Sequence, residues 1–198
     1  MVKVSQNELV AGAIAGKAVS FPTDTVPALA IKPEYGDRIY ELKQRPSSKP
    51  LILLGASISD LLHYVVYTAE ELAIWQRLIE QYLPGALTLV LPASAKVPQA
   101  INPTNSNTVG IRIPDCAIAC QILQQTGVLA TTSANISGTD ALTTMTAIAE
   151  TFPDVLVLED ADIPVKDKIG SGLPSTVVSW QDRQWKVLRQ GSVNINYK

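Results

Sequence analysis

Residues 109–131, VGIRIPDCAIACQILQQTGVLAT, contain a strand, a helix and a second strand in direct succession. The segment 109–113 is rich in β-branched residues, and Pro114 ends it because proline has no backbone N–H to give to a sheet. Asp115 is expected to cap the following helix, which Gly127 closes. Short strands that alternate with helices are the building pattern of α/β folds. This stretch therefore predicts an α/β protein.

The same alternation extends along the rest of the chain. Further strands are expected at 17–21, 51–54, 87–91, 128–131, 155–158, 176–180 and 185–188, and further helices at 33–45, 68–82 and 144–152. Capping boxes are expected to open a short N-terminal helix at Ser5–Glu8 and a longer helix at Thr68–Glu71. Residues 181–184 are expected to form a hairpin turn. Because several neighbouring strands have no helix between them, we expect a mixed sheet flanked by helices, in a single domain of residues 1–198.

The composition describes a compact protein with a large core and little net charge. Of the 198 residues, 46% are hydrophobic and only 17% are charged, which excludes a disordered chain. Sixteen Lys and Arg residues against eighteen Asp and Glu residues leave a formal charge of −2. No overall positive field can hold a nucleic acid non-specifically, so any anion site must be local. No apolar run approaches the ~18 residues that span a bilayer, and we expect a cytoplasmic protein without a membrane partner.

The cysteine and histidine content excludes several kinds of catalytic or metal site. Cys116 and Cys120 lie four residues apart in an expected helix, a spacing that suits two small core residues better than a disulfide. Two cysteines and the single His63 are too few for a zinc site. His63 also has no Ser or Cys beside it to activate, so a structural role is expected for it. An enzyme built from this chain must work without histidine.

Three short polar segments are candidates for chemistry, and each has an ordinary structural alternative. Lys43, Arg45 and Lys49 crowd the end of an expected helix, where cations are favoured by the helix dipole and are usually just solvated. Arg112 lies in an apolar strand, and because an unpaired buried charge costs several kcal/mol, it must meet an internal carboxylate or a ligand. Residues 130–138, ATTSANISG, form either a ligand-binding loop or a simple capping turn.

Taken in order, these segments resemble one known family. Lys43-Gln44-Arg45 and Ser133-Ala134-Asn135 are similar to the KxR and SxN elements of the YrdC-like family of threonylcarbamoyl-adenylate synthases. The resemblance continues in FPTDTV (21–26), VGIRIP (109–114), TSANISG (132–138), LPSTVV (173–178) and LRQG (188–191). It runs from about Gln6 to Val193, nearly the whole chain.

The resemblance implies a fold, a reaction and a set of partners. The implied fold is a twisted mixed sheet with helices around a concave, positively charged cleft. The chain stops soon after LRQG, so it resembles the short form of the family, which has no additional C-terminal domain. The implied reaction is a nucleotidyl transfer that converts L-threonine, bicarbonate and ATP, with Mg²⁺ carried by the nucleotide, into threonylcarbamoyl-AMP and pyrophosphate. Its product serves the t6A modification of tRNA, so tRNA or proteins of that machinery are expected as transient partners.

The resemblance also assigns expected roles to individual residues, carried over position by position. The expected threonine-binding residues are Thr23, Arg112, Ser133 and Ser175. The expected ATP-binding residues are Lys43, Arg45, Lys49, Thr108, Asn135, Thr143 and Arg189, and Lys43 and Arg45 are the expected catalytic residues. Charge neutralisation and alignment at phosphorus are what phosphoryl transfer needs, and cations and hydroxyls supply both. No dedicated metal site is expected.

The chain departs from the family pattern at two places. The family usually continues PTDTV with an aromatic residue and Gly, whereas Pro27-Ala28 stand here, and Ala86 follows Pro84-Gly85 where the family has a second proline. Pro27 removes a backbone donor and an aromatic wall, which bears on substrate selectivity.

The competing hypothesis is a non-catalytic RNA-binding module that uses the same basic residues. The net negative charge and an aromatic content of only 6% argue against it.

Overall fold

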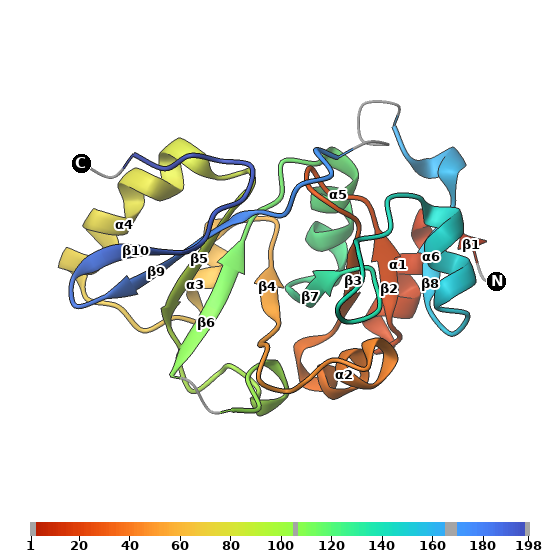
Figure 1. Cartoon of the computed structure of the whole chain (residues 1–198), viewed down its shortest axis with the longest axis horizontal. Coiled ribbons are helices and arrows are strands. Elements are labelled where there is room, and N and C mark those ends of the chain that lie inside the picture. Colours follow the sequence, from red (N-terminus) through yellow and green to blue (C-terminus); the bar gives the residue numbers. More distant parts are fainter. Residues whose placement is uncertain (1–2, 105–106, 165–169, 197–198) are drawn as a thin grey trace.

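The structure is a computed structural model that describes residues 3–104, 107–164 and 170–196. Within this part of the chain, a 10-stranded sheet runs through the molecule in the order β1-β8-β2-β3-β7-β4-β6-β5-β9-β10 (Figure 1). The strands are β1 (Lys3–Val4), β2 (Val19–Phe21), β3 (Ala28–Ile31), β4 (Ile52–Leu54), β5 (Leu87–Pro92), β6 (Thr108–Arg112), β7 (Leu129–Ser133), β8 (Leu156–Leu158), β9 (Thr176–Gln181) and β10 (Gln184–Arg189). The helices are α1 (Gln6–Ile14), α2 (Asp37–Lys43), α3 (Ile58–Leu62), α4 (Ala69–Tyr82), α5 (Ala117–Thr126) and α6 (Met145–Thr151), with 3₁₀ turns η1 (Pro33–Tyr35), η2 (Gln99–Ile101) and η3 (Asp160–Asp162).

The sheet is mixed, as the sequence predicts. Parallel pairs join β1 to β8, β8 to β2, β4 to β6 and β5 to β9, and the remaining neighbours are antiparallel. Strands that are distant in sequence therefore become neighbours, such as β3 beside β7 and β7 beside β4. This crossing of the chain brings the polar segments of the sequence to the middle of one sheet.

Helices cover the two ends of the sheet. Helices α1, α5 and α6 gather at the end that contains β1, β8 and β2, and α4 lies at the β9–β10 end (Figure 1). There Trp75 of α4 meets Trp180 of β9 edge to face with ring centroids 6.0 Å apart, and Trp180 lies 5.1 Å from Trp185 of β10. Aromatic pairs at these separations contribute beyond their buried area, so the three indoles fix the hairpin to the helix.

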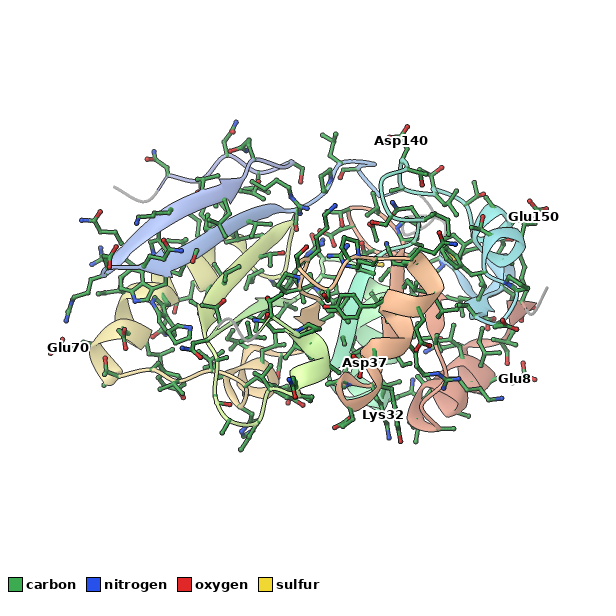
Figure 2. All side chains as sticks on the ribbon, turned by 60° about the horizontal axis from the view of Figure 1, so that its bottom comes forward. Glu8, Lys32, Asp37, Glu70, Asp140 and Glu150 are labelled. Carbon is green, nitrogen blue, oxygen red and sulfur yellow. The ribbon has the colours of Figure 1, made fainter. Side chains whose placement is uncertain are left out.

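Charged side chains mostly point outward. Glu8, Asp140 and Glu150 project from the periphery (Figure 2), whereas Lys43 is 1% exposed and Arg112 is 5% exposed. Buried cations are costly unless they are paired or hydrogen-bonded, so these two mark a part of the fold that is not built for packing alone.

Most of the expected local signals are confirmed. Both capping boxes form: Ser5 caps α1 and Thr68 caps α4, and each bonds reciprocally with a glutamate in the first turn of its helix, Glu8 and Glu71. The hairpin between β9 and β10 turns at 182–183, where both residues have positive φ, as a two-residue type I′ turn requires. Both cysteines are free.

Other expectations were wrong in detail. The expected helix at 33–45 is divided into η1 and α2 at Gly36, whose backbone packs so closely on Ala100 that a Cβ would lie 2.7 Å from the Ala100 carbonyl oxygen. The N-cap of α5 is Cys116 and not Asp115. Strand β3 and helix α3 were not expected, because ALAI (28–31) lacks the β-branched run of a typical strand and ISDLL (58–62) is too short to show a period. Among the described residues, no helix combines the length and apolarity needed to cross a bilayer.

Candidate functional site

A cavity of about 430 Å³ lies against the middle of the sheet. Its walls come from β3, β7, β4, β6, β5 and β9, which are consecutive neighbours in the sheet. On β6, Thr108, Gly110 and Arg112 line the cavity, whereas Val109 and Ile111 between them belong to the hydrophobic core. This alternation is the period of two that a strand imposes on its side chains. One face of the central strands therefore forms the cavity while the other face holds the core.

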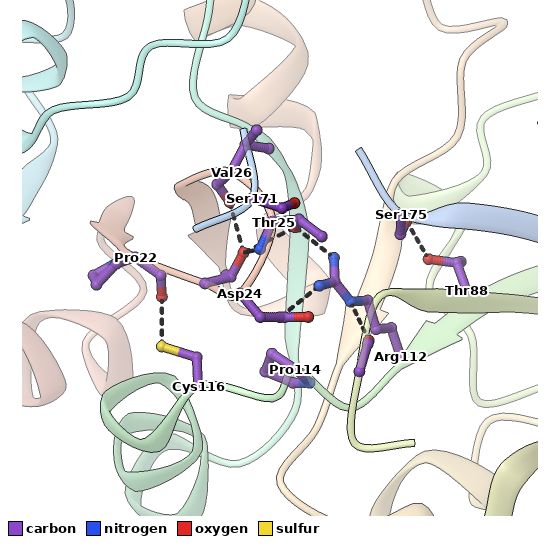
Figure 3. A network of polar contacts seen from close by, with 12 residues as sticks. Pro22, Asp24, Thr25, Val26, Thr88, Arg112, Pro114, Cys116, Ser171 and Ser175 are labelled. Atoms are coloured by element: carbon purple, nitrogen blue, oxygen red, sulfur yellow. Dashed lines mark hydrogen bonds and ion pairs between the residues drawn. The ribbon is translucent and has the colours of Figure 1, made fainter. Parts of the chain in front are cut away.

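Arg112 is held by three hydrogen bonds at the end of β6 (Figure 3). Its Nε donates to the Gly85 carbonyl oxygen at 2.9 Å, Nη1 donates to Thr25 Oγ1 at 2.9 Å, and Nη2 donates to Asp24 Oδ1 at 2.6 Å. Burial lowers the pKa of Arg112, and the Asp24 carboxylate opposes this shift. The buried cation thus has an internal carboxylate as its partner, one of the two solutions that the sequence left open.

The turn before β3 is closed by a chain of hydroxyl groups. Thr23 Oγ1 donates to the Val26 carbonyl oxygen at 2.7 Å, accepts from the Thr25 backbone N–H, and lies 3.0 Å from Thr25 Oγ1. Because a hydroxyl has one proton, Thr25 Oγ1 must be the donor to Thr23 while it accepts from Arg112. The proton and both lone pairs of the Thr23 hydroxyl are therefore used inside the turn. Thr23 lines the cavity, but its hydroxyl is already satisfied.

Lys43 joins the end of α2 to the loop after β7. Its Nζ donates to the Ser133 carbonyl oxygen and, at 3.1 Å, to Asn135 Oδ1, while its own carbonyl oxygen accepts from the Ser137 N–H. Ser133 Oγ donates to the same Asn135 oxygen at 2.6 Å. Burial lowers the pKa of Lys43 to about 7, and the charge of Arg45 adds to the effect. A neutral amine has two N–H donors, and the two acceptors found here match that number.

Arg45 lines the cavity from the segment that follows α2. Its Nε donates to the Lys49 carbonyl oxygen at 2.9 Å, and Nη2 donates to the Pro50 carbonyl oxygen at 3.0 Å. Burial lowers the pKa of Arg45, and the charge of Arg189 contributes in the same direction. Arg45 therefore shapes its own loop and still presents a cation to the cavity.

Arg189 reaches the cavity because of a bulge in β10. The register shifts between Val187 and Arg189, so that Arg189 pairs with Val177 of β9, which lines the cavity. Without the extra residue, Leu188 would take this place and Arg189 would face the other side of the strand. Arg189 Nη2 donates to the Ser175 carbonyl oxygen at 2.8 Å, and the Ser175 hydroxyl lies 2.9 Å from that of Thr88.

The structure brings most of the expected site residues together. Those that line the cavity are Thr23, Arg45, Thr108, Arg112, Ser133, Ser175 and Arg189. Lys43 and Asn135 do not line it but bond directly to Ser133, which does. Lys49 and Thr143 are exposed and lie outside the lining. The sequence analysis missed Asp24 and Thr25 as partners of Arg112. The one available signal was the carboxylate in the FPTDTV segment, which could have been considered as the partner of a buried arginine.

The charge of the cavity wall is entirely positive within the described part of the chain. Arg45, Arg112 and Arg189 line it, and the described lining includes no Asp or Glu. Burial lowers the pKa of all three arginines, and the charge of Arg189 contributes to the shifts of the other two. Arginine side chains that share one hollow are stabilised by an anionic ligand, so the cavity suits an anion.

The single histidine lies apart from the arginine cavity. His63 lines a separate hollow of about 460 Å³ that shares no lining residue with the arginine cavity. The described residues contain no group of three or more His, Cys, Asp or Glu side chains arranged to hold a metal ion.

Comparisons with known proteins agree in family and fold. Residues 14–191 match the model of the Sua5/YciO/YrdC family, described as "Telomere recombination". The chain is similar to threonylcarbamoyl-AMP synthases of Bacillus subtilis, at 35% identity over 89% of this chain and 50% of the relative, and of Hydrogenovibrio crunogenus, at 33% identity over 88% of this chain and 91% of the relative. It thus spans about half the length of the first relative and most of the second.

Solved structures show the same architecture. Sua5 of P. abyssi complexed with L-threonine is similar over 96% of this chain and 55% of that chain, with a TM-score of 0.81 and 30% identity. E. coli YciO has a TM-score of 0.80 over 97% of this chain and 91% of that chain; at 22% identity, this likeness concerns the fold alone.

Proposed function

This chain belongs to the Sua5/YciO/YrdC family, and on that basis we propose that it is a threonylcarbamoyl-AMP synthase. The reaction would combine L-threonine and bicarbonate into a carbamate with loss of water. A carbamate oxygen would then attack the α-phosphorus of ATP, and pyrophosphate would leave. The observation that carries the proposal is the set of three arginines on one cavity, with Arg112 fixed by a carboxylate and a hydroxyl.

Arg112 would bind the carboxylate of threonine. A guanidinium has five N–H donors, and three are used by Gly85, Thr25 and Asp24. One N–H remains on each terminal nitrogen, the number that a carboxylate takes in a two-pronged contact. Ser133 and Ser175, which also line the cavity, would contact the rest of the amino acid.

Arg45 and Arg189 would bind the triphosphate of ATP and stabilise the charge that develops on the departing pyrophosphate. Lys43 would join them by leaving the Ser133 carbonyl oxygen for a phosphate oxygen, and Thr108 lies on the cavity wall for the nucleoside. Mg²⁺ takes oxygen ligands and keeps several waters, so it would be held mainly by the nucleotide phosphates, with the hydroxyl of Ser133 and the amide of Asn135 nearby. Lys49 and Thr143 are exposed and lie outside the cavity lining, so they would have to move toward the cavity to contact the nucleotide.

The product would supply the threonylcarbamoyl group for t6A in tRNA, and transfer to tRNA would require partner proteins. The direct test is release of pyrophosphate by the purified chain from ATP in bicarbonate buffer. We expect release that depends on L-threonine and that is lost in Arg112→Ala but kept in Arg77→Ala, an exposed arginine on α4. Salt-sensitive RNA binding without turnover would instead favour the non-catalytic module.

A further inference from the structure

The three arginines of the cavity differ in what neutralises them. Arg112 forms an ion pair of 2.6 Å with Asp24, and both side chains are largely buried. Arg45 and Arg189 donate to backbone carbonyl oxygens and to the Ser175 hydroxyl. Neither forms an ion pair with a carboxylate in the described ranges, 3–104, 107–164 and 170–196. One arginine is thus compensated before any ligand binds, and the other two keep their full charge.

Asp24 contacts Arg112 without occupying the cavity. Arg112 and Thr25 line the cavity, and Asp24 does not. Figure 3 shows the carboxylate of Asp24 beside the guanidinium, with Thr25 on another edge of the same group. Arg112 therefore belongs to the cavity wall while Asp24 stays outside it, and two of the five N–H groups of Arg112 are not used by Gly85, Thr25 or Asp24.

The backbone of Asp24 is itself held in position. The Ser171 N–H donates to the Asp24 carbonyl oxygen at 2.9 Å, and the Gly172 N–H donates to the Thr25 carbonyl oxygen at 3.0 Å. A Cβ on Gly170 would lie 2.3 Å from the Thr25 oxygen, so the segment 170–172 packs directly on the backbone of this turn. The backbone that carries Asp24 therefore cannot move away from Arg112 without breaking these contacts.

Charge decides which anion each arginine attracts. A triphosphate carries several negative charges and is drawn to uncompensated cations, whereas a single carboxylate needs mainly two aligned donors. With Asp24 beside it, Arg112 forms a neutral pair that offers two donors but little net field. Arg45 and Arg189 offer the field that phosphate needs.

We propose that Asp24 is a specificity-determining residue that reserves Arg112 for the amino-acid carboxylate and leaves Arg45 and Arg189 for the phosphates. The inference rests on the proposed function, because it assigns the two classes of anion to parts of the same cavity. Without Asp24, Arg112 becomes a third open cation, and phosphate competes with the amino acid for it. Asp24 acts through Arg112 and does not touch the reacting atoms.

The test measures competition between threonine and inorganic pyrophosphate by calorimetry, without turnover. In the wild-type chain, pyrophosphate should leave the affinity for threonine unchanged within a factor of about two. In Asp24→Asn, pyrophosphate should raise the apparent Kd for threonine at least about tenfold, the scale of one charge-assisted contact. Asp24→Glu, which keeps the charge, should behave like the wild type, and so should Asp140→Asn at an exposed site.

Two further results separate the possible failures. If Asp24→Asn binds threonine without competition from pyrophosphate, the inference is wrong even if the chain is active. If the wild type binds no threonine, the proposed function fails. The inference is then decided by the affinity for pyrophosphate alone. Asp24→Asn must bind pyrophosphate more tightly than the wild type, and the double variant Asp24→Asn, Arg112→Met must lose that gain in affinity. A variant that does not fold, as judged by circular dichroism, is replaced by Asp24→Ser in the same titrations.

Discussion

Lys43 Nζ lies 3.1 Å from Asn135 Oδ1, a contact between residues 92 positions apart. It joins the end of α2 to the loop after β7 and places an amine directly behind Ser133 on the cavity wall. The two short sequence elements KxR and SxN are therefore parts of one hydrogen-bonded unit. Its amine has a pKa lowered to about 7, so small changes of charge in the cavity decide its protonation.

Binding of ATP should be coupled to proton uptake by Lys43. Above pH 7 the amine of the free protein is mostly neutral, and nearby phosphates favour its charged form. Affinity for ATP should therefore fall as the pH rises from 7 to 9, by up to about tenfold per pH unit. Titration calorimetry at pH 8 in buffers of different ionisation enthalpy measures the uptake directly. Lys43→Met should abolish it, and a wild type that takes up no proton would contradict the assignment.

Loss of Arg45 should slow the chemical step more than it weakens threonine binding. Arg45→Ala removes one cation from the phosphate side of the cavity, and removal of one such donor typically costs about 10²-fold in turnover. Pyrophosphate release gives the rate, and Arg77→Ala is the matched control on an exposed helical surface. Near wild-type turnover in Arg45→Ala would remove Arg45 from the catalytic residues.

Replacing Arg112 with lysine should raise the Kd for threonine by about tenfold or more. An ammonium cannot keep the contacts to Gly85, Thr25 and Asp24 and also offer two parallel donors to a carboxylate. Affinity for ATP should change little, because the phosphates are assigned to other cations. Calorimetry with each ligand separates the two effects, and Arg183→Lys, at an exposed salt bridge, serves as the control. Equal loss of both affinities would count against separate anion sites.

A methyl group at Gly170 should disturb threonine binding from outside the cavity. The Cβ of Gly170→Ala would lie 2.3 Å from the Thr25 oxygen and 2.6 Å from the Thr23 oxygen, and backbone atoms cannot move aside cheaply. The turn that carries Asp24 must shift, so both the melting temperature and the threonine affinity should fall. Ser171→Ala keeps the N–H that bonds to Asp24 and should be nearly neutral. The comparison needs only thermal unfolding and one threonine titration for each variant.

Local patterns in the sequence predict much of the sheet, because each strand carries its own composition and each helix its own cap. The capping boxes at Ser5 and Thr68 and the turn at 182–183 follow from such local chemistry. Strand β3 does not, since ALAI is held in the sheet by its two neighbours and not by its own preference. The sequence analysis therefore missed a strand whose stability comes from long-range pairing, as well as helix α3, which is too short to show a period.

The same distinction holds for the site. The motifs shared with the family identified residues that do line the cavity, such as Arg45 and Arg189. The partner of Arg112 could not be chosen, because Asp24 lies 88 positions away and only the fold brings the two together. The bulge that turns Arg189 toward the cavity is equally a property of the β9–β10 pairing. The motifs identify the groups, and the topology decides which of them are neutralised.

The three indoles described at the α4 end of the sheet are also all the tryptophans that the chain contains. Tryptophan emission from this protein therefore reports on one region only, the hairpin whose far end carries Arg189 together with the helix it packs on. Unfolding or ligand contact at the opposite end, around α1 and α6, gives no tryptophan signal of its own. The chain therefore has a natural optical reporter for the hairpin that carries Arg189, with no label to introduce.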